Sequence, residues 1–201
     1  MEFDFDAITP AVGYKLLTST ILPRPIAWVT SVGADGVVNA APFSFFNAMG
    51  ANPPTVALGM VRDGVRGWKD TPRNILDSSE FVVNLVPENM AGAMNATAMA
   101  LPAGESEIDV AGLQVLASTR IAPPRIAGVP VAFECRAISS VVTGPMQVVV
   151  IGRVLAAHID DAVILDAERG YIDSPALGLI ARMHGAGWYA RTSDLFQLER
   201  P

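Results

Sequence analysis

Apolar residues are gathered in short runs that glycine, proline and acidic residues separate. The run over residues 26–32 is apolar and rich in β-branched side chains, and Asp35-Gly36 follows it after a short gap. An Asp-Gly pair between two such runs is typical of a β-hairpin, so we expect the chain to return as a strand over residues 37–46. Similar runs predict further strands over residues 55–61, 80–86, 131–142, 147–157 and 163–165.

Signals for helices are fewer. Thr9-Pro10 and Thr71-Pro72 each place a capping threonine before a proline, which is typical of a helix start. We expect short helices over residues 10–17, 72–76 and 88–100 and after Ser174-Pro175, and a loop over 102–109. Many closely spaced strands with few helices favour a mainly β fold, a β-barrel with short helices. A doubly wound parallel sheet is disfavoured because regular β–α alternation is missing.

Composition narrows the picture to one folded domain without a membrane segment. Apolar residues make up 51% of the chain and charged residues 17%, against a usual charged share of roughly 25%, which excludes a disordered protein. No stretch approaches the roughly 20 apolar residues that span a membrane, and the acidic start is unlike a signal peptide. We expect a cytoplasmic, self-associating protein with one domain over residues 1–201, its core over about 14–160 and a C-terminal extension over 161–201.

The net charge and the small number of metal-ligating residues exclude further classes of function. The net charge is −6 and no basic stripe stands out, so we expect no nucleic-acid partner. Cys135 is the single cysteine, which rules out an internal disulfide and a multi-cysteine metal site, and its strand context predicts an inert core residue. His158 and His184 are the two histidines, too few for a metal set, so no metal is expected.

A basic cluster stands out in this acidic chain. Four basic residues follow one another at short spacing: Arg62, Arg66, Lys69 and Arg73. The segment is predicted to be a loop and not a helix because it contains Gly64, Gly67 and Pro72. It leads into the helix predicted after Thr71. A lysine and a threonine hydroxyl at a helix N-terminus, beside free backbone N–H groups, are suited to a phosphate group. The alternative is a solvated loop followed by an ordinary capped helix.

The segment over residues 39–47 is the second candidate site. Pro42 and several polar side chains interrupt an apolar strand beside three phenylalanines, which indicates an edge or a bulge. A planar aromatic ligand could lie against it, with Ser44 and Asn47 bonding to its edge. The alternative is an irregular edge strand with aromatic core residues. His184, in a glycine-rich turn, is a candidate for lining a pocket, or else a plain loop histidine.

Several segments, taken in order, resemble the flavin reductase-like, FMN-binding split-barrel family. Each is weak alone, but their order and spacing over about residues 14–201 are specific. The segments are 22–31, 39–47, 52–54, 69–75, 80–84, 94–97 and 189–196.

The resemblance implies a six-stranded antiparallel Greek-key split barrel and a homodimer with flavin near its interface. It implies that the flavin is lined by Thr30, Ser31, Asn39, Ala41, Pro42, Ser44, Phe45, Phe46 and Asn47. It also implies that Lys69, Thr71 and Arg24 meet the flavin phosphate. FMN is the expected cofactor, with FAD left open, and NADH or NADPH is the expected electron donor.

The function that the resemblance implies is an FMN-dependent oxidoreductase, in the first instance an NAD(P)H:flavin reductase. The alternatives are a flavin-binding electron-transfer protein that does not oxidise NAD(P)H itself, or a barrel that binds another ligand or none. A partner oxygenase or another acceptor would take the electrons. His184 and Tyr189 are candidates for contact with the nicotinamide, although Gly185-Ala186-Gly187 departs from the family's arginine, glycine pair and aromatic residue.

Overall fold

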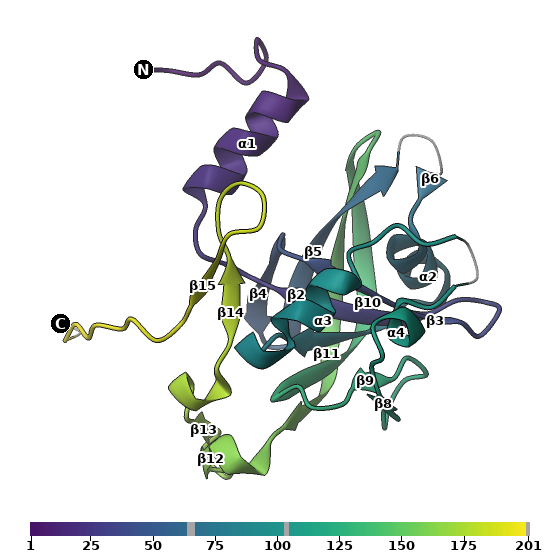
Figure 1. Cartoon of the computed structure of the whole chain (residues 1–201), viewed down its shortest axis with the longest axis vertical. Helices are drawn as coiled ribbons and strands as arrows, with labels where there is room; N and C mark the ends of the chain where they lie inside the picture. Colours follow the sequence, from purple (N-terminus) through teal and green to yellow (C-terminus); the bar gives the residue numbers. More distant parts are fainter. Residues whose placement is uncertain (64–66, 103–104, 200–201) are drawn as a thin grey trace.

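The computed structural model describes residues 1–63, 67–102 and 105–199. Its body is one curved antiparallel sheet with short helices around it, and helix α1 stands away from that body (Figure 1). The helices are α1 Pro10–Thr20, α2 Asp70–Ser78, α3 Ala91–Ala96 and α4 Glu107–Val110, with 3-10 turns η1 Glu88–Met90, η2 Asp161–Val163 and η3 Pro175–Leu177. The strands of the first half are β1 Arg24–Pro25, β2 Ala27–Val32, β3 Val38–Phe43, β4 Phe46–Ala51, β5 Pro54–Asp63, β6 Gly67–Trp68 and β7 Glu80–Leu85. Those of the second half are β8 Val115–Leu116, β9 Arg125–Ile126, β10 Val131–Gly144, β11 Gln147–Ile159, β12 Ile164–Asp166, β13 Tyr171–Ile172, β14 Ile180–Arg182 and β15 Tyr189–Arg191.

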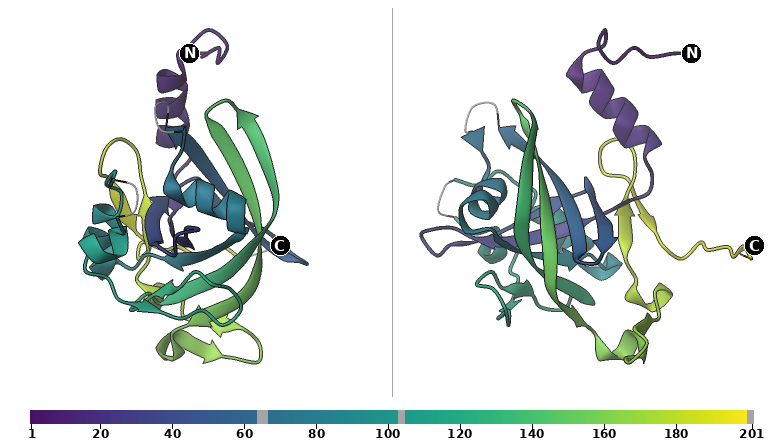
Figure 2. Two further views of the ribbon diagram at one scale, coloured as in Figure 1. Left: turned by 90° about the vertical axis from the view of Figure 1, so that its right-hand side faces the viewer. Right: turned by 180° about the vertical axis from the view of Figure 1, so that it is seen from behind.

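The main sheet has the strand order β3-β2-β7-β10-β11-β5-β4, and β6 pairs with β5. Each of these pairings is antiparallel. The long hairpin of β10 and β11 bends across the body, which Figure 2 shows from two further sides. Beyond β11 the chain returns to the body, where β14 pairs with β1 in a small sheet with β15. The mainly β class predicted from the sequence is confirmed.

The sheet curls around a first core. Side chains from β2 near one end of the strand order and from β5 near the other belong to the same buried cluster, and Ile75 of α2 joins them. Gly152 is required here because a Cβ at this position would overlap the ring of the buried Phe81. Cys135 lies in this cluster, and burial raises the pKa of its thiol to about 12. The prediction that Cys135 is an inert core residue therefore fits its position.

A second core lies on the other face of β2. Trp28 points to this side, and its indole N–H donates to Thr97 Oγ1 at 2.9 Å. Ile108 of α4, Met94 of α3 and Ile180 of β14 pack in the same cluster. Strands β2 and β3 are thus held between two apolar layers, which fixes the polar side chains that β3 carries toward α2 and α4.

Several predicted elements differ from those in the structure. The expected strand over 37–46 is two strands, because the chain turns at residues 44–45 and β4 pairs with β5 instead of continuing beside β2. The helix expected over 88–100 is the 3-10 turn η1 followed by α3, which ends at Ala96. Helix α4 occupies the end of the expected 102–109 loop, and η2 takes residue 163 from the expected strand. The helix predicted from Thr71-Pro72 begins earlier, at Asp70, and Lys69 is its N-cap.

No helix among the described residues is both long and apolar enough to cross a membrane. The same part of the chain holds no group of three or more histidine, cysteine, aspartate or glutamate residues placed to bind a metal ion.

Candidate functional site

The N-terminus of α2 offers hydrogen-bond donors without acceptors in the helix. The backbone N–H groups of Asp70 and Thr71 lie in the first turn, where an α-helix supplies no acceptor, and the helix dipole places positive charge there. Pro72 has no N–H group, so it leaves no further donor to satisfy. Lys69 is the N-cap and makes no side-chain capping bond, because an ammonium group has no lone pair with which to accept from these N–H groups.

A cavity of about 640 Å³ lies beside this helix end, and we call it the Lys69 cavity. It is formed where α2 faces β3, α4 and the segment after α3. Its lining residues are Asn39, Ala41, Pro42, Phe43, Val61, Trp68, Lys69, Asp70, Thr71, Pro72, Arg73, residues 97–102 and Glu107. Five residues of the predicted flavin set are therefore brought together here: Asn39, Ala41, Pro42, Lys69 and Thr71.

Among the described residues of the predicted basic cluster, one cation is left to bind an anionic ligand in this cavity. Arg73 forms an ion pair with Asp70, and the guanidinium of Arg62 lies 5.3 Å from the centre of the Trp68 ring. Arg66 lies outside the described residues. Within the part of the chain that the structure describes, Lys69 has no acidic partner. The lysine is consequently the cation best placed for an anionic ligand.

Glu107 is the cavity residue that sequence reasoning missed. Its side chain extends from α4 and is 6% exposed. Its Oε2 atom accepts hydrogen bonds from Asn39 Nδ2 at 2.8 Å and from the Ala40 N–H at 3.3 Å. Burial raises the pKa of this carboxyl above its usual range; the charge of Asp70 acts in the same direction, and the hydrogen bonds act against both. The sequence carries no signal that separates Glu107 from its acidic neighbours Glu105 and Asp109.

A buried network connects Glu107 to helix α2. The Thr71 hydroxyl donates to Asn39 Oδ1, and the Asn39 amide nitrogen donates onward to Glu107. The Ser31 hydroxyl also reaches Asn39 Oδ1 at 3.5 Å and accepts from Asn74 Nδ2 at 3.2 Å. The proton of Thr71 is therefore already used within the protein, so its hydroxyl can only accept from a ligand, whereas its backbone N–H can donate to one.

Two predicted flavin residues, Thr30 and Ser31, line neither this cavity nor the next one. Both side chains are buried, and the Thr30 hydroxyl donates to the carbonyl oxygen of Pro124. Ser31 stands behind Asn39 and orients its amide. Their direct contact with a ligand stays a prediction.

The remaining predicted flavin residues surround a separate cavity of about 400 Å³, which we call the Arg24 cavity. It lies between the end of α1 and strands β4 and β5, and it shares no residue with the Lys69 cavity. The predicted residues Arg24, Ser44, Phe45, Phe46 and Asn47 are found here, together with apolar side chains such as Leu17, Ile21 and Met49.

The Arg24 side chain connects α1 and the segment after it to the β14–β15 hairpin through hydrogen bonds. Its guanidinium donates to the carbonyl oxygens of Thr18 at 2.6 Å, Ile21 at 3.0 Å and Met183 at 2.9 Å, and it reaches Ser44 Oγ at 3.5 Å. Desolvation by burial lowers the pKa of this guanidinium. Because its donors are directed at protein carbonyls, Arg24 ties α1 to the β14–β15 hairpin, and a contact with the flavin phosphate stays a prediction.

His184 and Tyr189 belong to the hairpin of β14 and β15. The His184 ring stacks on Trp188, with centroids 6.0 Å apart and planes at 12°. Tyr189 packs against the second core, and the Arg182 guanidinium lies 4.9 Å from its ring centre. Neither lines the Lys69 cavity or the Arg24 cavity, so their contact with a second substrate stays a prediction.

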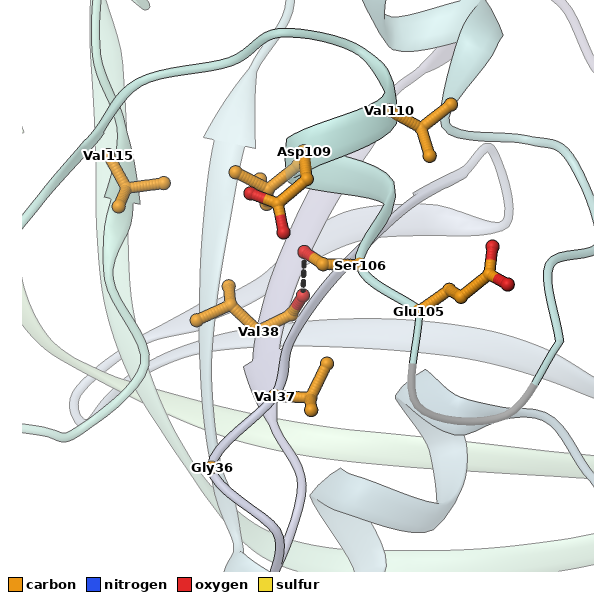
Figure 3. Close-up of a pocket in the computed structure, with 9 residues that line it drawn as sticks. Gly36, Val37, Val38, Glu105, Ser106, Asp109, Val110 and Val115 are labelled. Atoms are coloured by element: carbon orange, nitrogen blue, oxygen red, sulfur yellow. Dashed lines mark hydrogen bonds between the residues drawn. The ribbon is translucent and has the colours of Figure 1, made fainter.

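A third cavity, of about 540 Å³, lies on the other side of α4 (Figure 3). Ser106 donates to the Val38 carbonyl oxygen at 2.6 Å, and Glu105 and Asp109 also line this cavity. No cationic side chain among the described residues lines this cavity, so it lacks the combination of charges found in the Lys69 cavity.

Comparison with known proteins identifies relatives of this fold. The family model of the flavin reductase like domain matches residues 19–173. Nitrilotriacetate monooxygenase component B from Bacillus cereus has a TM-score of 0.92 and 36% identity, covering 98% of both chains. The 2-nitrobenzoate 2-nitroreductase NbaA of Pseudomonas fluorescens has a TM-score of 0.90 and 32% identity, covering 100% of this chain and 96% of its own. A split-barrel protein of Shewanella frigidimarina, at 19% identity and a TM-score of 0.81 over 100% of both chains, shows the fold alone.

Proposed function

The chain belongs to the flavin reductase-like domain family, and on that premise we propose that it is an FMN-dependent oxidoreductase that takes hydride from NADH or NADPH. The observation that supports this most is the Lys69 cavity. An available ammonium group stands there beside the N-terminus of α2, and this arrangement suits a phosphate group.

The residues of the Lys69 cavity fit a flavin mononucleotide in three respects. Lys69 and the N–H groups of Asp70 and Thr71 would hold the phosphate. Ala41, Pro42, Phe43 and Trp68 provide apolar walls that exclude water from a planar ring. Glu107 and Thr71 offer oxygen acceptors to hydroxyl groups. The bound flavin would supply the hydride chemistry, while the protein binds it, orients it and keeps water away.

FMN suits this cavity better than FAD because one cation is available. Arg73 is already paired with Asp70, so a second phosphate would meet no further free cation among the described lining residues. The buried carboxylate of Glu107 would also repel it. We therefore propose FMN as the resident cofactor.

We also propose that two copies of the chain associate through the region of the Arg24 cavity. Tyr14, Leu17 and Ile21 of the α1 segment are exposed there, as are Phe45 and Met49 at β4. A second copy would cover these apolar side chains, which a monomer leaves in water. This would place Ser44, Phe46 and Asn47 at the interface.

The electrons of the reduced flavin would pass to a partner. The Bacillus cereus relative is named as a component of a monooxygenase, and the Pseudomonas fluorescens relative as a nitroreductase. We propose that this chain passes reduced flavin to a partner oxygenase, or passes electrons directly to an organic acceptor.

Two measurements test the proposed function. Purified protein titrated with FMN should give the visible absorbance of a bound flavin with quenched ring fluorescence; absence of both would contradict flavin binding. Stopped-flow mixing of the FMN complex with NADH or NADPH should then bleach that absorbance. A bound flavin that neither nucleotide bleaches would instead favour an electron-transfer protein.

A further inference from the structure

Among the described residues, the hydrogen bonds that other residues donate to Glu107 go to one carboxylate oxygen. The bonds from Asn39 and Ala40 both reach Oε2, and the backbone N–H of Glu107 itself also donates to the carboxylate. A carboxylate has about four lone-pair sites, so acceptor capacity remains at Oε1. Glu107 is 6% exposed and lines the Lys69 cavity, so a donor on a ligand there can reach this oxygen.

The network behind Glu107 fixes this arrangement. Asn39 Oδ1 receives the hydroxyl protons of Thr71 and Ser31, so the amide nitrogen of Asn39 must point at Glu107. Oε2 consequently stays an acceptor within the protein. A donor supplied by a ligand can reach the carboxylate through Oε1, and the other charged groups lining the cavity are Lys69, Asp70 and Arg73.

The two ends of the cavity select different chemical groups. The ammonium of Lys69 and the first N–H groups of α2 attract an anion. A carboxylate oxygen accepts hydrogen bonds from hydroxyl groups and repels phosphate. A ligand that suits both carries one anionic group on a chain of neutral hydroxyls, which describes a phosphorylated polyol.

We propose that Glu107 is a specificity-determining residue that binds the ribityl hydroxyls of the flavin. This inference rests on the proposed function, because it assumes that the Lys69 cavity holds FMN. Lys69 recognises the phosphate and Glu107 recognises the hydroxyl chain between phosphate and ring. The carboxylate also disfavours any ligand that would bring a second phosphate to the same place.

The test compares three flavins on one substitution, Glu107→Gln. Its carbonyl oxygen can keep the bonds from Asn39 and Ala40, which turns the amide NH₂ group, a donor, toward the cavity. Riboflavin carries the hydroxyl chain without phosphate, and lumiflavin has a methyl group in its place. The amide can donate to a hydroxyl oxygen, so a charge-assisted hydrogen bond is replaced by a weaker neutral one. Riboflavin should therefore bind roughly tenfold more weakly, FMN should lose less, and lumiflavin should be unchanged. FMN loses less because removal of the negative charge favours its phosphate.

Asp109→Asn is the matched control, because it removes the same charge from the same helix at a residue that lines the third cavity and not the Lys69 cavity. It should leave all three affinities unchanged. Thermal unfolding checks that each variant folds. Should Glu107→Gln fail to fold, Glu107→Asp keeps the charge but withdraws the oxygen, so it should weaken riboflavin and FMN alike and leave lumiflavin unchanged.

Unchanged riboflavin affinity in Glu107→Gln, or an equal loss for lumiflavin, would overturn the assignment of Glu107. If Lys69→Ala still weakened FMN selectively in that case, the proposed flavin site would stand and only the role of Glu107 would fall. A wild-type protein that bound none of the three flavins would overturn the proposed function and this inference together.

Discussion

Two buried glutamates of this molecule differ in how the hydrogen bonds from other residues are distributed over their carboxylate oxygens. Glu134 on β10 is fully buried, and both of its oxygens are in use. Oε1 accepts from the Thr119 N–H at 2.7 Å and its hydroxyl at 3.1 Å and lies 2.6 Å from His158 Nε2, and Oε2 accepts from the Arg120 N–H at 2.7 Å. Glu107 is 6% exposed, and the two hydrogen bonds that it receives from other described residues share one oxygen.

The pKa shifts follow from that difference. Burial raises the pKa of a carboxyl group in both places. At Glu134 the hydrogen bonds from Thr119, His158 and Arg120 outweigh burial, so the pKa of this carboxyl lies below its ordinary value. At Glu107 burial prevails and the pKa is raised. The number of donors around a buried carboxylate thus distinguishes a structural anchor from a group with bonding capacity left for a ligand.

Glu134 anchors the segment that follows β8. It holds Thr119 and Arg120, while Glu80 Oε2 accepts from the Ala122 N–H at 2.9 Å. This segment has little regular structure, so side-chain carboxylates replace the backbone partners that a sheet would supply. Among the described residues, the donors that other segments supply to Glu107 both go to Oε2.

The largest effect is expected when the structural anchor is removed. Glu134→Ala leaves two backbone N–H groups and the Thr119 hydroxyl without their acceptor, so the free energy of unfolding should fall by about 3–5 kcal/mol. Urea unfolding of the variant and the wild type measures this. The folded fraction should bind FMN as the wild type does. A stable Glu134→Ala protein would show that counting donors does not identify an anchor.

A smaller effect is expected at the phosphate end of the Lys69 cavity. Lys69→Ala should weaken FMN by about 1.5–3 kcal/mol, roughly tenfold to a hundredfold, because a charge-assisted hydrogen bond is lost. Riboflavin, which lacks the phosphate, should be little affected. Lys15→Ala, the other lysine of the chain and an exposed residue of α1, is the control and should change neither affinity. Equal losses for both flavins in Lys69→Ala would show that the lysine does not contact the phosphate.

The smallest effect is a difference in pH dependence between the two glutamates. The folded state binds the Glu107 proton more tightly than the unfolded state, so the wild type should lose stability relative to Glu107→Gln as pH rises from the ordinary glutamate pKa through the raised one. Glu134 has the opposite sign. Its contribution is present above the ordinary pKa and is lost as pH falls through the lowered one, which Glu134→Gln would reveal.

Unfolding by urea at a series of acidic to neutral pH values measures both slopes. Opposite signs are expected for the two variants. Slopes of the same sign would mean that the two carboxyl groups do not differ in the way their hydrogen bonds indicate.

The sequence predicts local features of the site better than its long-range ones. The helix N-terminus beside Lys69 follows from residue types at short spacing, although the helix begins at Asp70, because a cap and a dipole depend on neighbouring residues. Most strands are predicted for the same reason. The turn that separates β3 from β4 was missed, since the pairing of β4 with β5 depends on sheet register rather than on local preference.

Long-range geometry also explains why the predicted flavin residues lie in two separate cavities. Residues 39–47 look like one surface in the sequence, but the turn at residues 44–45 sends Asn39 to the Lys69 cavity and Asn47 to the Arg24 cavity. Glu107 reaches Asn39 across many intervening residues, because α4 packs on β3. No spacing rule brings these two together before the fold is known.

A crystal structure of the protein with FMN would show whether the Lys69 cavity holds the flavin. We expect the phosphate at the N-terminus of α2, within hydrogen-bond distance of Lys69 Nζ and of the Asp70 and Thr71 N–H groups, with a ribityl hydroxyl on Glu107 Oε1. A phosphate bound in the Arg24 cavity, with the Lys69 cavity unoccupied, would contradict it.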